Sequence, residues 1–277
     1  MPNIYHNMLQ RLRNIYDEDE ARAVAFLVLE DAFGVSRTDV YADKVKDFSP
    51  QESVLLENIV QRILNGEPIQ YILGRARFCG RDFRVTPHTL IPRPETEELV
   101  GIIENRFQPA NILDVGTGSG CIAVSLKLSF PDAYVEAWDI SSEALAVAQD
   151  NARSLGADVV FRQVDALVSD VPQFAPRVGE CILVSNPPYV CQSEAKDMEA
   201  RVLEHEPHKA LFVPDDDPLL FYRALCNIAR DGNFAVVAIE TNRAYADNVA
   251  ALFLNEGFSR ADVLCDQFGN KRFVIVF

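Results

Sequence analysis

The sequence of 277 residues predicts an α/β protein, in which a doubly wound and mostly parallel sheet follows a small N-terminal helical bundle and a β-hairpin connector. Three observations support this fold class. About the first 70 residues carry helical periodicities only, apolar runs of strand length then alternate with helical segments, and Gly269-Asn270 marks a hairpin near the C-terminus. Alternating strands and helices imply a parallel sheet covered on both faces. We therefore expect a helical domain over residues 1–73, a connector over 74–86 and a larger domain over 87–277.

The helical bundle is predicted from one strong helix and two weaker signals. Ser49-Pro50-Gln51-Glu52 combines an N-cap serine, a proline at the first helical position and a glutamate that can reach back to the cap. An apolar stripe follows at helical spacing and consists of Leu55, Leu56, Ile59, Val60, Ile63 and Leu64, and Gly66 is placed to end the helix. Upstream lie a weaker stripe of Leu9, Leu12 and Ile15 and an apolar block over residues 21–33.

The pattern changes at about Pro68 to short aromatic and β-branched stretches separated by glycines, which predicts the hairpin-like connector. Three prolines within residues 87–94 mark the start of the larger domain. Strands are predicted at 111–115, 134–139, 159–164, 181–185 and 234–240, and helices at 121–130, 143–154 and, behind an Asp217 cap, 218–230. An antiparallel pair over 261–264 and 272–277 closes the sheet.

The charge balance argues against a protein that binds nucleic acid. The chain has 26 Lys and Arg residues against 41 Asp and Glu residues, which gives a formal charge of −15 and a pI near 4.7. Affinity for phosphate backbones comes from Lys and Arg, so no direct nucleic-acid partner is expected. Residues 1–10 lack the apolar core of a signal peptide, and no window approaches the roughly 20 apolar residues that span a bilayer. We therefore expect a cytoplasmic protein with no membrane partner.

The cysteines and histidines do not predict a metal site. No C-x-x-C pair occurs, and the neighbours are mostly apolar, so we expect reduced and buried thiols at Cys79, Cys121, Cys181, Cys191, Cys226 and Cys265. His205-Glu206-Pro207-His208 separates its histidines by three positions with a proline between them, whereas zinc-binding helices use a separation of four.

A cofactor site is predicted where the first strand of the larger domain leads into Asp114-Val115-Gly116-Thr117-Gly118-Ser119-Gly120 and then a helix. Glycines let the main chain turn sharply and approach a ligand closely, and the helix N-terminus adds N–H donors. The G-x-G-x-G spacing and the preceding carboxylate favour S-adenosylmethionine over a dinucleotide. Asp114 would repel a pyrophosphate but suits a cationic sulfonium ligand that carries an ammonium group.

Two further acids follow the next two strands. Asp139 ends the second strand, where it can bind both ribose hydroxyls, and Asp165-Ala166 after the third strand can meet the edge and face of adenine. In such sheets, ligands bind at the carboxyl ends of the strands. Any one of these acids could be a simple N-cap, but together at three consecutive strand ends they favour a ligand site.

An acceptor site is predicted after the fourth strand, at Ser185-Asn186-Pro187-Pro188-Tyr189. The two prolines fix the backbone and remove two N–H donors, so the Pro187 carbonyl and the Asn186 side-chain oxygen can both point into a pocket. This acceptor pair matches the two hydrogens of an NH₂ group, and Tyr189 can pack on a planar substrate. We expect Asn186, Pro187 and Tyr189 to act in catalysis by positioning and electrostatic preorganisation. The alternative is a rigid turn with a packed tyrosine.

These residues resemble known methyltransferases. Asn186-Pro187-Pro188-Tyr189 is similar to the N-P-P-Y motif of enzymes that modify planar nitrogens: DNA adenine-N6, DNA cytosine-N4 and protein glutamine-N5 methyltransferases. The blocks Leu90-Ile91-Pro92-Arg93-Pro94-Glu95-Thr96-Glu97 and Pro68-Ile69-Gln70-Tyr71-Ile72-Leu73-Gly74 resemble more narrowly the bacterial release factor glutamine methyltransferases of the PrmC/HemK type. The resemblance covers nearly the whole chain, including the helical bundle.

The resemblance implies a Rossmann-like S-adenosylmethionine-dependent methyltransferase domain and a substrate-recognition role for the helical domain. The implied reaction transfers a methyl group to the side-chain amide nitrogen (N5) of the glutamine in the Gly-Gly-Gln motif of class 1 peptide chain release factors. By the same resemblance, residues 116–120, Asp139 and Ala166 contact the cofactor, Asn186 touches both ligands, and Pro187, Pro188 and Tyr189 hold the glutamine.

The chain departs from the family pattern at one place and matches it only loosely at another. Ala166 stands where relatives often have an aromatic residue, so adenine stacking is weaker or comes from elsewhere. Residues 202–207 match the R-F-E-P stretch of the family only loosely, and we assign them no role.

Four other functions are considered. A glutamine methyltransferase of a ribosomal protein shares the catalytic motif, and the Pro94–Glu97 block favours the release factor. A DNA amino-methyltransferase is disfavoured by the charge and by the lack of an obvious target-recognition insert. The intact N-P-P-Y motif argues against a non-catalytic binding module, and Asp114 with the glycine spacing argues against a dehydrogenase.

Overall fold

The computed structural model describes residues 4–42, 44, 47–168, 174 and 179–277. The chain divides into two compact units, of which one contains Met1–Arg75 and Glu199–His205 and the other Ala76–Met198 and Glu206–Phe277. We call them the helical unit and the sheet unit and describe each by itself.

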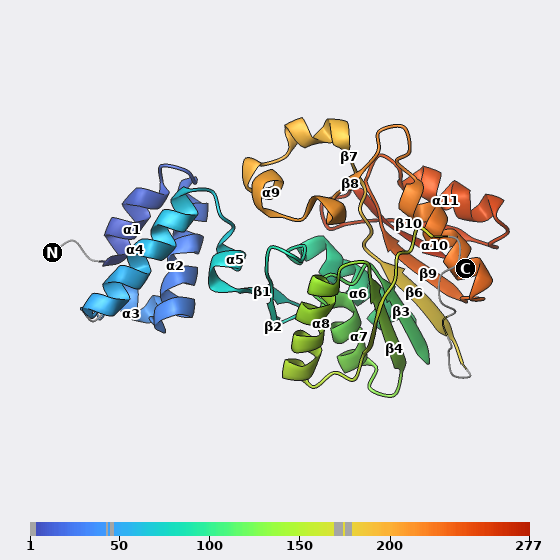
Figure 1. Cartoon of the computed structure of the whole chain (residues 1–277), viewed down its shortest axis with the longest axis horizontal. Coiled ribbons are helices and arrows are strands. Elements are labelled where there is room, and N and C mark those ends of the chain that lie inside the picture. Colours follow the sequence, from blue (N-terminus) through green and yellow to red (C-terminus); the bar gives the residue numbers. More distant parts are fainter. Residues whose placement is uncertain (1–3, 43, 45–46, 169–173, 175–178) are drawn as a thin grey trace. The chain divides into compact units, whose positions relative to one another are not determined.

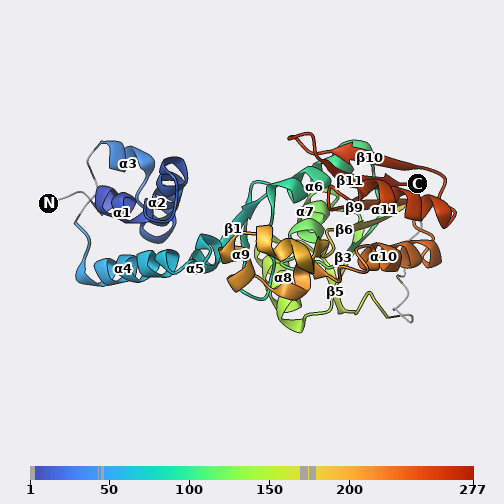
Figure 2. The same ribbon diagram turned by 90° about the horizontal axis from the view of Figure 1, so that it is seen from above.

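The helical unit is built on α1 (Ile4–Leu12), α2 (Glu18–Phe33) and α4 (Pro50–Leu64), with the shorter α3 (Arg37–Tyr41) and α5 (Ile69–Leu73). In Figures 1 and 2, α1 lies beside both α2 and α4. Leu12, Leu29 and Ile63 are completely buried at its centre. The expected capping box of α4 is confirmed, because Ser49 N donates to Glu52 Oε2 at 2.8 Å and Glu52 N donates to Ser49 Oγ at 3.2 Å.

Two residues of the predicted stripes are exposed. Leu55 has 47% of its surface accessible and Ile15 has 44%, so neither side chain lies on the buried face of its stripe. A repeat of four residues advances about 40° beyond a full helical turn, and the stripe therefore drifts away from the buried face. Ile15 lies beyond the end of α1 at Leu12, in the turn to α2.

A short helix at the end of the predicted helical domain precedes the hairpin of the connector. Residues 69–73 form α5, which ends at Gly74 with a φ of 72°, although their aromatic and β-branched content suggested extended structure. The hairpin itself consists of β1 (Arg75–Phe78) and β2 (Arg81–Arg84). Cys79 and Gly80 between these strands both have positive φ, of 47° and 74°, which is the backbone of a tight type I′ turn.

Seven strands of the described residues form the main sheet in the order β10-β11-β9-β6-β3-β4-β5. Their bounds are Asn111–Val115 (β3), Tyr134–Asp139 (β4), Val160–Gln163 (β5), Cys181–Ser185 (β6), Val236–Glu240 (β9), Ala261–Cys265 (β10) and Lys271–Val276 (β11). All of them run in one direction except β11, which is antiparallel to both neighbours. The predicted doubly wound sheet with a closing antiparallel pair is confirmed.

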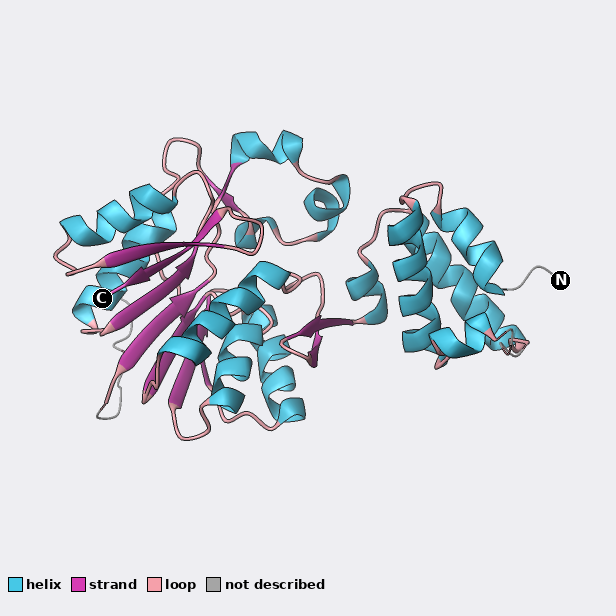
Figure 3. Cartoon of the chain, turned by 180° about the vertical axis from the view of Figure 1, so that it is seen from behind, coloured by secondary structure: helices cyan, strands magenta, loops and turns pink. Residues whose placement is uncertain are grey.

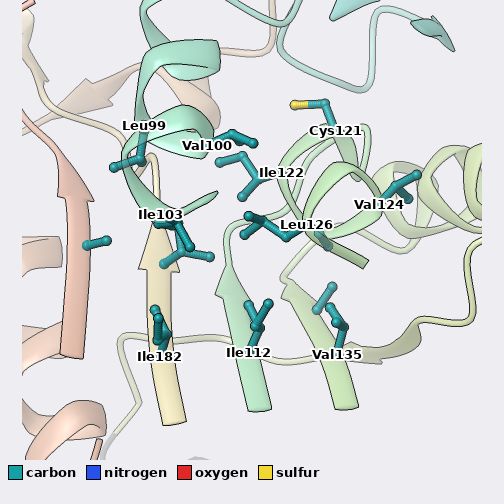
Figure 4. Packing of buried hydrophobic residues seen from close by; sticks show 14 of the residues in the cluster. Leu99, Val100, Ile103, Ile112, Cys121, Ile122, Val124, Leu126, Val135 and Ile182 are labelled. Carbon is teal, nitrogen blue, oxygen red and sulfur yellow. The ribbon is translucent and has the colours of Figure 1, made fainter. Parts of the chain in front are cut away.

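Helices cover both faces of this sheet (Figures 1 and 3). One face packs against α6 (Pro94–Arg106), α7 (Cys121–Ser129) and α8 (Ser142–Leu155), and the other against α10 (Leu220–Asp231) and α11 (Ala246–Asn255). Figure 4 shows the first face, where side chains of α6 and α7 meet Ile112, Val135 and Ile182 of the strands. The sequence did not predict α6 or α11.

Two local predictions in the sheet unit were wrong. Asp217 does not cap α10, because the helix begins at Leu220 behind Leu219 and the Asp217 carboxylate pairs with Arg223 instead. Cys265 is exposed and Cys79 is half-buried, whereas the other four cysteines are buried. Cys265 ends the edge strand β10, which leaves it less covered than a central strand. All six cysteines lie in the described residues and none forms a disulfide there.

An insertion follows β6 and contains β7 (Val190–Cys191), a 3₁₀ turn (Gln192–Asp197), α9 (Ala200–His205), a second 3₁₀ turn (His208–Ala210) and β8 (Phe212–Val213). β7 and β8 pair in parallel. α9 belongs to the helical unit, where Arg201 forms an ion pair with Glu20 at 2.8 Å and lies over the Tyr16 ring. Within the described ranges, no helix is both long and apolar enough to cross a membrane.

Candidate active site

The candidate site lies where the order of the strands reverses. The chain proceeds from β3 outward to β5 and then returns to β6 on the other side of β3, so β3 and β6 are neighbours. Asp114 lies opposite Val184 in this pair, and Ser185 Oγ donates to the Val115 carbonyl at 2.7 Å. The glycine-rich turn and the N-P-P-Y segment therefore leave adjacent strand ends, at the position where doubly wound sheets bind their ligands.

The glycine-rich turn needs glycine at all three of its alternating positions. Gly116, Gly118 and Gly120 have φ values of 76°, 55° and 80°, which L side chains rarely adopt. A Cβ at Gly116 or Gly118 would meet nothing within 4 Å, whereas a Cβ at Gly120 would lie 3.0 Å from the Ala148 Cβ on α8. Gly116 and Gly118 thus leave open space beside the main chain for a ligand, and Gly120 lets α7 and α8 approach.

Asp114 is buried with one carboxylate oxygen unpaired. Its Oδ2 accepts hydrogen bonds from Thr117 Oγ1 at 2.6 Å and Ala123 N at 3.2 Å, while Oδ1 has no hydrogen-bond partner among the described residues. Burial raises the pKa of Asp114 to about 7. A buried acceptor without a donor is costly, so this oxygen fits a ligand that brings a positively charged donor, such as the ammonium group of S-adenosylmethionine.

Two residues of the turn, Thr117 and Ser119, form hydrogen bonds within the protein. The Thr117 hydroxyl points to Asp114. Ser119 is buried, and its carbonyl accepts from Asn151 Nδ2 of α8 at 2.8 Å. Both residues therefore hold the shape of the turn.

The two other predicted acids lie at neighbouring strand ends. Asp139 Oδ2 accepts from Gly118 N at 2.8 Å and Oδ1 accepts from Ser141 N at 2.9 Å, and burial raises the pKa of Asp139. Asp165 lies beyond the end of β5, next to β4, and its Oδ1 accepts from Leu167 N at 2.9 Å. Asp139 thus ties the turn after β3 to the end of β4. Because β3, β4 and β5 are neighbouring parallel strands, the three acids lie at one edge of the sheet.

Sequence reasoning missed the apolar surface beside these acids. Ile140 follows Asp139 and is 50% exposed, and Leu167 follows Ala166 and is 41% exposed. Ala166 itself is partly buried against the core. Ile140 and Leu167 offer apolar surface where Ala166 offers little. The signal in the sequence was an apolar residue one position after Asp139 and another two positions after Asp165.

The acceptor side is a pocket lined by Leu90, Arg93, Asn186, Pro187, Tyr189, Val190, Ala210 and Leu211. Pro188, which was expected to hold the substrate, is not among these lining residues. Tyr189 Oη donates to Glu240 Oε1 at 3.2 Å, and burial raises the pKa of the Tyr189 hydroxyl. The tyrosine is therefore held in place by its hydroxyl.

Thr96 and Glu240 were also missed as parts of the site. Asn186 Nδ2 donates to Thr96 Oγ1 at 3.0 Å, and Thr96 Oγ1 donates to Glu240 Oε2 at 2.7 Å. Thr96 is 2% exposed and Glu240 is 1% exposed. They come from α6 and from the end of β9, 144 positions apart, so no local pattern could connect them.

The segment 205–208 contributes a carboxylate. Glu206 is buried, and it accepts from Arg93 Nη2 at 2.6 Å and from Ile91 N at 3.3 Å. It thereby fixes the I-P-R-P block at the rim of the pocket. No group of three or more metal-ligating side chains occurs in the part of the chain that the structure describes.

Comparison with known proteins agrees with this geometry. Residues 94–212 match the family described as Methyltransferase small domain. A solved methyltransferase from Pyrococcus furiosus has a similar fold, with a TM-score of 0.52 and 17% identity over 80% of this chain and 98% of that chain. The fold and the site define a methyltransferase that uses S-adenosylmethionine, which confirms the predicted class of enzyme and its cofactor.

The family follows from the full length of the chain. Residues 4–74 match the family described as PrmC N-terminal domain. A release factor glutamine methyltransferase of Bacteroides thetaiotaomicron is 45% identical over 266 residues, 95% of each chain. One of Flavobacterium psychrophilum is 38% identical over 99% of this chain and 98% of its own. The chain belongs to the release factor glutamine methyltransferase family, as the resemblance predicted.

Proposed function

We propose that this enzyme transfers a methyl group from S-adenosylmethionine to the side-chain amide nitrogen (N5) of the glutamine in the Gly-Gly-Gln motif of class 1 peptide chain release factors. The names of its relatives support the release factor as substrate, because these relatives match the chain over nearly its whole length. The N-P-P-Y segment supports a planar nitrogen as the acceptor.

The observation that carries the proposal is the orientation of the Asn186 amide. Its Nδ2 is bound to Thr96, so Oδ1 is left as a hydrogen-bond acceptor with no partner among the described residues. Asn186 and Pro187 both line the acceptor pocket. The Asn186 Oδ1 and the Pro187 carbonyl then form the acceptor pair that an NH₂ group requires.

This pair addresses the chemical difficulty of the reaction. An amide nitrogen is a poor nucleophile because its lone pair is delocalised into the carbonyl group. Two acceptors on its hydrogens favour a pyramidal nitrogen with a more localised lone pair, and Tyr189 holds the planar group in place. The enzyme thus acts by positioning and by preorganised electrostatics. Pro188 contributes by fixing the backbone of the motif.

The cofactor side of the proposal uses the edge formed by β3, β4 and β5. Asp114 would bind the ammonium group, the open main chain at Gly116 and Gly118 would lie beside the ligand, and Asp139 would bind the ribose hydroxyls. Asp165 and Ala166 would meet adenine, with Thr117, Ser119 and Gly120 keeping the shape of the turn. The bound cofactor supplies an electrophilic methyl group on sulfur.

The test is to incubate the protein with methyl-labelled S-adenosylmethionine and, separately, a class 1 release factor, ribosomal proteins and duplex DNA. We expect label on the release factor, and mass spectrometry should place it on the glutamine of the Gly-Gly-Gln motif. Label in ribosomal protein alone would replace the proposed substrate, and label in DNA alone would exclude glutamine as the acceptor.

The variant Asn186→Ala tests the role of the Asn186 side chain. It removes the side-chain acceptor, so we expect the rate of transfer to fall by about 100-fold or more. Cofactor binding should be retained in part, because the acids at the three strand ends are intact. Unchanged turnover in this variant would contradict the role of the Asn186 side chain.

A further inference from the structure

Three hydrogen bonds connect the N-P-P-Y segment to two buried residues outside it. Asn186 Nδ2 donates to Thr96 Oγ1 at 3.0 Å, Thr96 Oγ1 donates to Glu240 Oε2 at 2.7 Å, and Tyr189 Oη donates to Glu240 Oε1 at 3.2 Å. Glu240 therefore accepts directly from Tyr189 and from Thr96, and Thr96 in turn accepts from Asn186.

The directions of these bonds follow from the chemistry of the groups. An ionised carboxylate can only accept, so each hydroxyl facing Glu240 must donate its single hydrogen to it. The oxygen of Thr96 is then left as an acceptor toward Asn186. Of the two ends of the Asn186 amide, only the NH₂ can donate, and it must therefore face Thr96.

The reverse orientation of Asn186 is disfavoured by burial. A flipped amide would place Oδ1 against a Thr96 oxygen whose hydrogen is already used, so two acceptors would face each other. Thr96 and Glu240 are both at least 98% buried, so water cannot readily mediate between them. An unsatisfied buried polar group is costly, so the orientation that pairs both ends of the contact is selected.

The surroundings of Glu240 support its role as an acceptor. Burial raises its pKa, while the hydroxyls of Thr96 and Tyr189 and the positive charge of Arg272 oppose this rise. The two hydroxyls and Arg272 thus favour the ionised form of Glu240, which can accept from Thr96 on one oxygen and from Tyr189 on the other.

We propose that Thr96 and Glu240 are positioning residues that fix the Asn186 amide with its oxygen toward the acceptor pocket and thereby make the site selective for an amide NH₂ over a carboxylate. The proposal rests on the proposed glutamine methylation. With the amide fixed in this way, the pocket presents two acceptors, which bind the two hydrogens of glutamine and repel the oxygens of glutamate.

The experiment compares Thr96→Val, which replaces the hydroxyl by a methyl group of similar size, with Thr96→Ser, which keeps the hydroxyl. The readouts are kcat for release factor methylation, the Kd for S-adenosylmethionine, and inhibition by a release factor in which glutamate replaces the glutamine. We expect Thr96→Val to lower kcat by about 10- to 100-fold, with the cofactor Kd within about twofold of the wild type. Thr96→Ser should recover most of kcat.

The inhibition readout separates positioning from a structural role. Without the Thr96 oxygen, Asn186 can turn its NH₂ toward the pocket and donate to a carboxylate. The measured quantity is the ratio of the affinity for the glutamate-containing release factor to the affinity for the glutamine substrate. We expect this ratio to be at least about fivefold higher in Thr96→Val than in the wild type. A general loss of folding would weaken binding of both proteins and would not shift this ratio.

Each failure has its own signature. A wild-type enzyme that does not label the release factor glutamine refutes the proposed function. The positioning role is refuted if the wild-type enzyme labels the glutamine and Thr96→Val keeps both the wild-type kcat and the wild-type ratio of affinities. Thr96→Ala, which removes the hydroxyl without requiring space, gives the same comparison if thermal unfolding shows that the valine variant does not fold.

Discussion

At the residue scale, Asp114 shows how the site retains a charged group in the core. Thr117 and Ala123 satisfy one of its oxygens, and the second is left without a donor among the described residues. Such a group destabilises the ligand-free protein unless it takes up a proton, and it is satisfied when a cationic ligand arrives.

This arrangement predicts opposite pH dependences for stability and for cofactor binding. Burial raises the pKa of Asp114 from 3.8 to about 7, so between these values the folded protein holds a proton that the unfolded chain has lost. The contribution of Asp114 to the free energy of unfolding therefore falls as pH rises through this window. Affinity for S-adenosylmethionine should rise as pH approaches and passes about 7, because the ionised carboxylate attracts the ammonium group.

Calorimetric titration and thermal unfolding across this window test both dependences, with Asp114→Asn as the matched control. The asparagine variant cannot ionise at this position, so both of its curves should be flatter than those of the wild type. Wild-type and variant curves of equal slope would contradict an ionised Asp114 as the ammonium partner.

At the scale of the element, the glycine-rich turn divides its work between ligand and packing. Gly118→Ala introduces a side chain at a φ of 55° with nothing within 4 Å, and we expect a loss of about 1–2 kcal/mol in the free energy of unfolding from backbone strain. Gly120→Ala adds a Cβ 3.0 Å from Ala148, so we expect a further loss of about 1–3 kcal/mol from overpacking.

Urea unfolding and cofactor titration distinguish these two roles. Gly118→Ala should weaken cofactor binding by more than its loss of stability explains, because it narrows the open space beside the main chain. Gly120→Ala should act mainly on stability. Equal losses of stability in the two variants would contradict a packing role for Gly120.

The elements differ in how well the sequence predicts them, for physical reasons. β3, β4 and β6 have the predicted bounds, because these central parallel strands are mostly apolar runs that end at or just before polar or glycine residues. α9 has no buried residues, so it carries no apolar stripe from which a helix could be predicted. α6 begins directly after a proline-rich segment that indicated only a boundary.

The residues of the site also differ in how well the sequence predicts them. The glycine-rich turn and the N-P-P-Y segment are contiguous in sequence, so their residue types could be interpreted locally. Glu240 ends a strand and Thr96 lies in the first turn of a helix, and their hydrogen bond exists only because β9 lies next to β6 and α6 packs beside them. Partners fixed by tertiary structure alone have no local signal.

At the scale of the whole molecule, the insertion after β6 joins the two units in sequence. The chain leaves the sheet unit at Met198, contributes Glu199–His205 to the helical unit and returns at Glu206. Glu206 then pairs with Arg93 at the acceptor pocket. The segment that follows the N-P-P-Y motif therefore carries residues of both units, which a division of the sequence at residues 73 and 86 does not describe.

The charge of −15 leads to the last prediction. Some of the acidic groups are buried at strand ends, as at Asp114, but most acidic side chains lie on the surface, where they attract a partner with a basic face. We expect the rate of association with the release factor to fall several-fold as salt rises from about 20 to about 150 mM, because the screening length shortens to about 8 Å. Stopped-flow measurements across this range test the expectation, with the turnover of the preformed complex as the control that salt leaves nearly unchanged. An association rate independent of salt would rule out electrostatic steering. The methyltransferase assignment would stand, because it depends on the strand ends and not on the surface charge.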